Sequence, residues 1–100
     1  MAEVRWTDQS IYDIENIAEF IAKDSETYAR IQVERIFEET EILEGFPFAG
    51  RVVPELKDKN IREIIFGTYR IIYRIFSKSQ VDILTIHHSS RLLKNNVRFK

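Results

Sequence analysis

Hydrophobic residues follow two different spacings along the chain, and each spacing predicts a different kind of element. In residues 2–6, "AEVRW", apolar and polar positions alternate, which is typical of a strand. Residues 8 to about 23 repeat isoleucine and alanine every three or four positions, which predicts an amphipathic helix capped by Thr7 or Asp8. A similar stripe predicts a second helix that is capped by Asp24 or Ser25 and ends at about Glu44. Because the break between the helices is short, we expect an antiparallel helical hairpin.

The second half of the chain has the composition of strands. Runs rich in isoleucine, valine and aromatic residues predict strands at about 61–66, 69–76 and 81–88, whereas residues 45–60 are expected to form a loop. The connections between the three strands are short, so neighbouring strands should be antiparallel. We therefore expect an α+β fold of the order strand, helix, helix, strand, strand, strand. The hairpin should pack on one face of a mainly antiparallel four-stranded sheet, and the pattern leaves open which edge the first strand joins.

Alternation also separates the two faces of these strands, because successive side chains point to opposite sides. In the strand at 69–76 one set is uncharged and should face the helices, whereas the other set mixes arginine with large apolar residues and should be exposed until a partner covers it. The strand at 81–88 is apolar on both sides, which favours a protein partner on the second face. The helix-facing set is Tyr69, Ile71, Tyr73 and Ile75, with Val81, Ile83, Thr85 and His87; the opposite set is Arg70, Ile72, Arg74 and Phe76, with Asp82, Leu84, Ile86 and His88.

Composition narrows the class of protein. One hundred residues are expected to form a single domain, 1–100, and the absence of cysteine excludes disulfides and cysteine-bearing zinc sites. A net charge of −1 argues against a general nucleic-acid binder, although residues 61–100 hold eight basic residues against two acidic ones. The chain shows no signal-peptide pattern, and no apolar run approaches the ~18 residues of a membrane span. We therefore expect a cytoplasmic protein without a membrane partner.

Two arginines on the predicted third strand are the first candidates for function. Arg70 and Arg74 project from the same face, where their guanidinium groups can bind carboxylates or phosphates in bidentate fashion. The structural alternative is that they pair with Glu63, Asp82 or Glu55 and only solvate the outer face.

The segments "HHSSR" and "AGRVVPEL" hold the next candidates. His87 and His88 are adjacent on a strand and so face opposite sides, which makes them poor ligands for one metal ion. One of them can act as a general acid or base, but more often one packs and the other is solvated. Glu55 is a candidate general base that is more often a solvated loop carboxylate, and Gly50 is expected to supply an unusual backbone angle. No metal or cofactor is expected.

Three segments together resemble the RelE/ParE superfamily of toxins from type II toxin–antitoxin modules. They are "FPFAGRVVPEL", "IREIIFGTYRIIYRI" and "ILTIHHSSRLL", and the opening "VRWTDQSIYDIENIAEFIA" is similar to the first strand and helix of that family. The resemblance implies a helical hairpin on one face of a sheet and a functional face on the other. It also implies a cognate antitoxin that wraps around the toxin and binds DNA, so that the toxin contacts DNA only indirectly, through the antitoxin.

The superfamily has two branches with different targets. RelE-like members cut messenger RNA on the ribosome, whereas ParE-like members inhibit DNA gyrase without being nucleases. Arg70 and Arg91 match arginines of the RelE-like site, but the lysines and the C-terminal tyrosine of that site have no counterpart here. Glu55, Arg70 and His88 resemble the carboxylate, arginine and histidine of other ribosome-dependent members. The incomplete nuclease set and the net charge of −1 favour the ParE-like branch.

The sequence therefore predicts a ParE-like toxin that inhibits DNA gyrase by protein–protein contact and is neutralised by an antitoxin. Two alternatives stay open: a ribosome-dependent endoribonuclease acting on mRNA, and a degenerate homologue that only binds antitoxin. If the protein is a nuclease, its catalytic residues would be Glu55, Arg70, His88 and Arg91. The residues expected to bind the target or the antitoxin are Arg62, Arg70, Ile72, Arg74, Phe76, His88 and Arg91.

Overall fold

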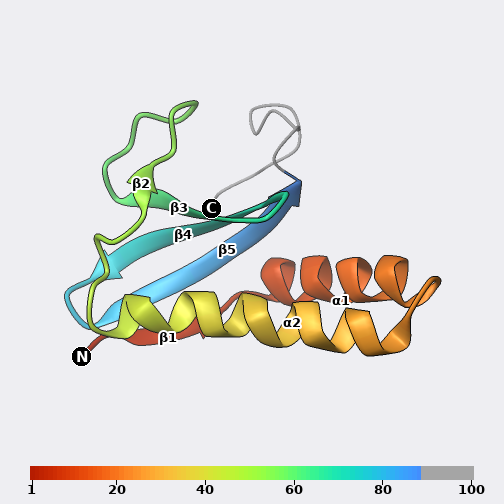
Figure 1. Ribbon diagram of the computed structural model, residues 1–100. Helices are drawn as coiled ribbons and strands as arrows, with labels where there is room; N and C mark the ends of the chain where they lie inside the picture. The colour runs from red at the N-terminus through yellow and green to blue at the C-terminus, as the bar shows by residue number, and fades with distance from the viewer. Residues whose placement is uncertain (89–100) are drawn as a thin grey trace.

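A computed structural model describes residues 1–88, in which two helices lie on one face of a single sheet (Figure 1). This confirms the predicted α+β fold and the order of its main elements. The elements are β1 Glu3–Trp6, α1 Asp8–Ala22, α2 Glu26–Glu41 with the one-turn 3-10 helix η1 Ile42–Glu44, β2 Arg51–Val52, β3 Ile61–Phe66, β4 Tyr69–Ser77 and β5 Gln80–His88.

The sheet has five strands in the order β1-β5-β4-β3-β2, and only β1 runs parallel to its neighbour. The first strand therefore joins the sheet beside β5. The prediction of four strands was wrong because β2 is only two residues long, too short for an alternation to show within the predicted 45–60 loop. No helix within residues 1–88 is long and apolar enough to cross a membrane.

Side-chain caps begin both helices where the sequence indicated. The Thr7 hydroxyl accepts a hydrogen bond from the Ser10 backbone N–H at 3.2 Å, and the Ser25 hydroxyl accepts one from the Tyr28 N–H at 3.0 Å. These caps satisfy backbone donors that have no partner inside the helix. The second helix changes to 3-10 geometry at Ile42, so the predicted end near Glu44 is the end of η1.

The main core lies between the helices and the sheet. The predicted inward set of β4 is confirmed, because Ile71 and Tyr73 are fully buried there and Tyr69 and Ile75 pack against them. Burying such a side chain stabilises the fold by about 1.5–3 kcal/mol. The buried members of this core are Ala2, Ile14, Ile36, Leu43, Ile71, Tyr73, Val81, Ile83 and Ile86.

A β-bulge in β5 breaks the alternation that the sequence suggested. Tyr73 is opposite Ile83 but Ile72 is opposite Thr85, so Leu84 is an extra residue in the ladder. Ile86 consequently joins the helix-facing core, and its predicted place on the opposite face was wrong.

Two residues near the start of the chain bond to the bulged segment. The Thr7 hydroxyl donates to the Ile83 carbonyl oxygen at 2.7 Å, and the Asp13 carboxylate accepts from the Ile86 backbone N–H at 3.1 Å and from the Thr85 hydroxyl. Thr7, which caps α1, and Asp13 of α1 thus provide hydrogen-bond partners to the part of β5 that lies beyond the end of β1.

The face of the sheet away from the helices, here called the outer face, is partly covered by the chain itself. Residues 53–60, the 53–60 loop, rise on that side of the sheet between β2 and β3 (Figure 1). Beneath the loop Val53, Ile61 and Ile72 form a second buried cluster, with Leu56 and Leu84 packed against it. Ile72 is fully buried, so the expectation that it lies on an exposed face was wrong.

Candidate functional site

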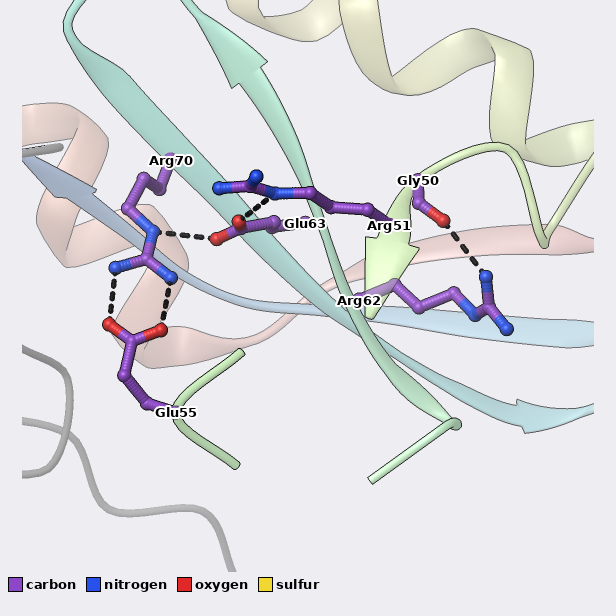
Figure 2. A network of polar contacts seen from close by, with 6 residues as sticks. All are labelled: Gly50, Arg51, Glu55, Arg62, Glu63 and Arg70. Atoms are coloured by element: carbon purple, nitrogen blue, oxygen red, sulfur yellow. Dashed lines mark hydrogen bonds and ion pairs between the residues drawn. The ribbon is translucent and has the colours of Figure 1, made fainter. Parts of the chain in front are cut away.

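Arg70 lies at the centre of a network of ion pairs on the outer face (Figure 2). Its Nε donates to a Glu63 oxygen at 2.6 Å, while Nη1 and Nη2 donate to the two oxygens of Glu55 at 2.7 and 2.8 Å. The Arg70 side chain is only 7% exposed. Bidentate pairing of this kind is among the strongest hydrogen bonding available to arginine, so both ends of the guanidinium group are already bound.

Glu63 connects Arg70 to a second arginine. Its carboxylate is fully buried, and its other oxygen accepts a hydrogen bond from Arg51 Nε at 2.5 Å. Pairing of β2 with β3 places Arg51 directly opposite Glu63, and β4 brings Arg70 to the same face from the other side. Two arginines thus balance Glu63 and Glu55, which is the condition under which charges are tolerated inside a protein.

The network keeps Arg70 charged. Hydrogen bonding and charge from Glu55 and then Glu63 raise the pKa of the Arg70 guanidinium above its ordinary value, although burial acts in the opposite direction. The 53–60 loop, which carries Glu55, is therefore held to the outer face by a permanent cation as well as by the apolar cluster around Ile72. In the free chain this arrangement is chemically a structural anchor.

Arg62 and Tyr73 hold the chain between α2 and β2 against the other side of the sheet. Arg62 Nε donates to the Lys59 carbonyl oxygen at 2.9 Å. Its Nη1 donates to the Gly50 carbonyl oxygen at 3.0 Å, as Figure 2 shows. The Tyr73 hydroxyl donates to the Pro47 carbonyl oxygen at 2.7 Å and accepts from the Gly50 N–H at 2.9 Å. Arg62, predicted as a binding residue, thus also bonds the backbone of two loops.

Gly50 is needed for a close approach. A Cβ at this position would lie 2.6 Å from the Glu63 carbonyl oxygen and 2.7 Å from the Tyr73 hydroxyl oxygen. Its predicted unusual backbone angle was wrong, because the positive φ angles among residues 1–88 belong to Lys57 and Gly67. Burial raises the pKa of the Tyr73 phenol, and the Gly50 N–H and the charge of Arg62 oppose that effect.

The other predicted site residues are spread over both faces. Arg74 is half-buried on the outer face and forms no ion pair with any residue in 1–88, whereas Phe76 is 62% exposed. His88 is exposed and lies beside Tyr69, with ring centroids 6.0 Å apart. The histidine opposite Arg70 is the buried His87.

The fold therefore brings together only part of the predicted nuclease set. Glu55 and Arg70 are in direct contact, but His88 pairs across the ladder with Tyr69, whose side chain packs towards the helices. Arg91 lies outside the described residues. Within residues 1–88 no three metal-ligating side chains come close enough to hold a metal ion.

Sequence reasoning found one part of the network and missed another. The alternative that Arg70 pairs with Glu63 or Glu55 is what the structure contains, with both carboxylates engaged at once. Arg51 was not singled out as a candidate, although it stands in "FPFAGRVVPEL", one of the segments that carry the family resemblance. Asp82 was the third carboxylate offered as a partner in that alternative, and it forms no ion pair with Arg74, although the two residues are opposite each other on β4 and β5.

One comparison with known proteins identifies a family. The family model described as ParE toxin of type II toxin–antitoxin system, parDE, matches residues 4–93. A search of curated proteins found no match.

Two solved structures share the fold. A chain of the chromosomal ParDE toxin–antitoxin system from P. aeruginosa superimposes with a TM-score of 0.73 at 20% identity, covering 88% of this chain and 96% of that one. A chain of the toxin–antitoxin complex RelBE2 from Mycobacterium tuberculosis gives a TM-score of 0.55 at 24% identity, covering 87% and 96%. At these identities the likeness shows the fold, whereas the family model spans most of the sequence. The chain therefore belongs to the ParE toxins of type II toxin–antitoxin systems, within the RelE/ParE superfamily.

Proposed function

We propose that this toxin arrests growth by binding DNA gyrase through protein–protein contact, and that a cognate antitoxin neutralises it. The observation that carries the proposal is the state of Arg70. Its guanidinium group is bound at Nε, Nη1 and Nη2 by two carboxylates and is almost fully buried. An arginine in that state holds a loop to a sheet and does not offer a free cation to a phosphate group.

The endoribonuclease alternative draws support from one contact, because the fold does bring Glu55 beside Arg70. In that mechanism Glu55 would deprotonate a 2′-hydroxyl group and Arg70 would stabilise the charge that develops on the phosphate. Here the two groups bind each other, and Glu63 adds a second negative charge at 2.6 Å from Arg70. An entering phosphate would be repelled by both carboxylates unless the 53–60 loop moved away.

The antitoxin surface is proposed on the part of the outer face that the 53–60 loop leaves open. Arg74 there has no ion-pair partner within residues 1–88, and Phe76 exposes a large apolar side chain. Arginine and aromatic residues are both enriched at protein–protein interfaces. An antitoxin segment with a carboxylate near an apolar side chain would pair with Arg74 and cover Phe76. The toxin would contact operator DNA only through this antitoxin.

The test uses purified toxin in two assays. We expect it to inhibit supercoiling of relaxed plasmid by purified gyrase and to accumulate cleaved DNA, with the Ile72→Asp chain as an inactive, unfolded control. Toeprinting on translating ribosomes should show no codon-specific cleavage of mRNA. Undiminished supercoiling at saturating toxin contradicts the gyrase proposal, and codon-specific cleavage would replace it with the nuclease alternative. Normal growth during confirmed soluble expression would instead identify a degenerate homologue that only binds antitoxin.

A further inference from the structure

The turn between α2 and β2 exposes aromatic side chains around an open hollow. We call residues 42–49 the aromatic turn. Phe46 is 68% exposed and Phe48 is 60% exposed, and Ile42 beside them is 51% exposed. The hollow of about 620 Å³ is lined by Ile42, Gly45, Phe46, Pro47, Phe48 and Ala49. Contiguous apolar surface of this kind is uncommon on proteins that act alone and usually marks an interaction site.

This surface is already fixed in the free chain. The buried Tyr73 side chain is bonded to Pro47 and Gly50, on both sides of Phe48, at 2.7 and 2.9 Å. Arg62 holds the Gly50 carbonyl oxygen at 3.0 Å, and its guanidinium carbon lies 4.9 Å from the centre of the Phe48 ring. Binding to a surface held in one conformation loses little conformational entropy.

A positive charge lies beside Phe48, one of the residues that line the hollow. Arg62 uses Nε and Nη1 for backbone carbonyl oxygens, and its Nη2 forms no hydrogen bond with any residue in 1–88. Two N–H donors therefore remain beside the exposed Phe48 ring. Glu41 and Glu44 flank Ile42 and Leu43 in the sequence, so the chain next to Ile42 carries negative charge.

We propose that the toxin binds its protein target through the aromatic turn. The occupant is a segment of that target which places a large apolar side chain in the hollow and a carboxylate on Arg62 Nη2. Aromatic residues, phenylalanine among them, and arginine are enriched at protein–protein interfaces. This inference rests on the proposed function in that the toxin must act by protein–protein contact.

The shape of the turn favours the target over the antitoxin as occupant. A folded target cannot wrap around the toxin, so it needs a small surface that is formed before the encounter, and the bonds from Tyr73 and Arg62 provide one. An antitoxin segment that folds on binding can adapt its conformation to a long path over the toxin. Its affinity therefore depends less than that of a folded target on a turn that is formed in advance.

The test is growth arrest in a bacterial host that expresses the chain without antitoxin. Phe46→Ser should need at least tenfold more protein than the unmodified chain for the same arrest, and Phe46→Tyr should restore it because the ring is kept. The matched control is Phe20→Ser on α1, where the side chain is 70% exposed and far along the sequence from the turn. We expect the control to arrest growth as the unmodified chain does. Thermal unfolding of all three purified variants should be unchanged within error.

The other outcomes overturn either this surface assignment or only the choice of gyrase as the target. Full arrest by Phe46→Ser means that the target does not use this turn, and equal loss in Phe20→Ser means that any exposed phenylalanine matters. Full arrest that the co-expressed antitoxin no longer relieves would assign the turn to the antitoxin. Arrest that depends on Phe46 while purified gyrase stays active would remove gyrase as the target and leave the surface assignment in place. A chain that never arrests growth contradicts both proposals.

Discussion

Two ends of one strand face show what burial does to the same residue type. Arg70 and Arg74 both point to the outer face from β4, yet Arg70 is nearly buried between Glu55 and Glu63, whereas Arg74 is half-exposed and has no ion pair within residues 1–88. The difference comes from the 53–60 loop, which supplies Glu55 and covers Ile72 next to Arg70. One end of the face has thus become a second core, and the other end is open to a partner.

The largest expected effect separates the two apolar members of this face. Ile72→Asp should abolish cooperative unfolding, because it places an unpaired carboxylate in the cluster with Val53 and Ile61. Phe76→Asp should change the free energy of unfolding by no more than about 0.5 kcal/mol, since the side chain is 62% exposed. Urea unfolding followed by circular dichroism compares the two. A cooperative transition in Ile72→Asp would show that the 53–60 loop does not bury Ile72.

The two arginines give the next largest difference. Arg70→Met should lower the free energy of unfolding by about 3–5 kcal/mol, because the buried Glu63 carboxylate loses one of its two arginine partners and keeps only Arg51. Arg74→Met should change it by about 0.5 kcal/mol or less. A double-mutant cycle with Glu63→Leu provides the control, since removing both charges should recover part of the loss. Equal effects of the two arginine substitutions would contradict the contrast between the two ends.

Tyr73 tests the opposite face of the same strand. Tyr73→Phe should cost about 1–3 kcal/mol, since the Pro47 carbonyl oxygen and the Gly50 N–H both lose a partner. The Tyr73 pKa is raised in the folded state, so its contribution is fully present below the ordinary value of about 10 and is lost as pH rises through the folded value. The stability difference between the two proteins, measured by urea unfolding from pH 7 to 11, should therefore narrow above pH 10. A constant difference would show that the phenol does not titrate in this way.

The sequence predicts the parts of this molecule that depend on neighbours along the chain. The inward set of β4 follows from strict alternation, and the helix caps follow from Thr7 and Ser25. The bulge at Leu84 cannot be predicted in this way, because the bulged segment is hydrogen-bonded to Thr7 and Asp13, which lie more than seventy positions away in the sequence.

The candidate site divides in the same way. Arg70 was identified from its strand position, but its burial depends on a loop whose few apolar residues have no period. Arg51 meets Glu63 only because a two-residue strand pairs there, and a strand that short leaves no pattern in the sequence. The sequence placed His88 on the face of Arg70, which was wrong: the bulge at Leu84 shifts the ladder between β4 and β5, so His87 lies opposite Arg70.

Growth arrest by the Glu55→Gln chain distinguishes a structural anchor from a catalytic pair most directly. The amide keeps the shape and one acceptor for Arg70 but cannot act as a general base, so we expect a stability loss of about 1–2 kcal/mol and no loss of toxicity. The measurement is growth after induction at matched soluble protein, with thermal unfolding of the purified chain as the control. Arrest equal to that of the unmodified chain is the predicted result. Lost arrest in a chain that still folds would mean that Glu55 and Arg70 carry out chemistry.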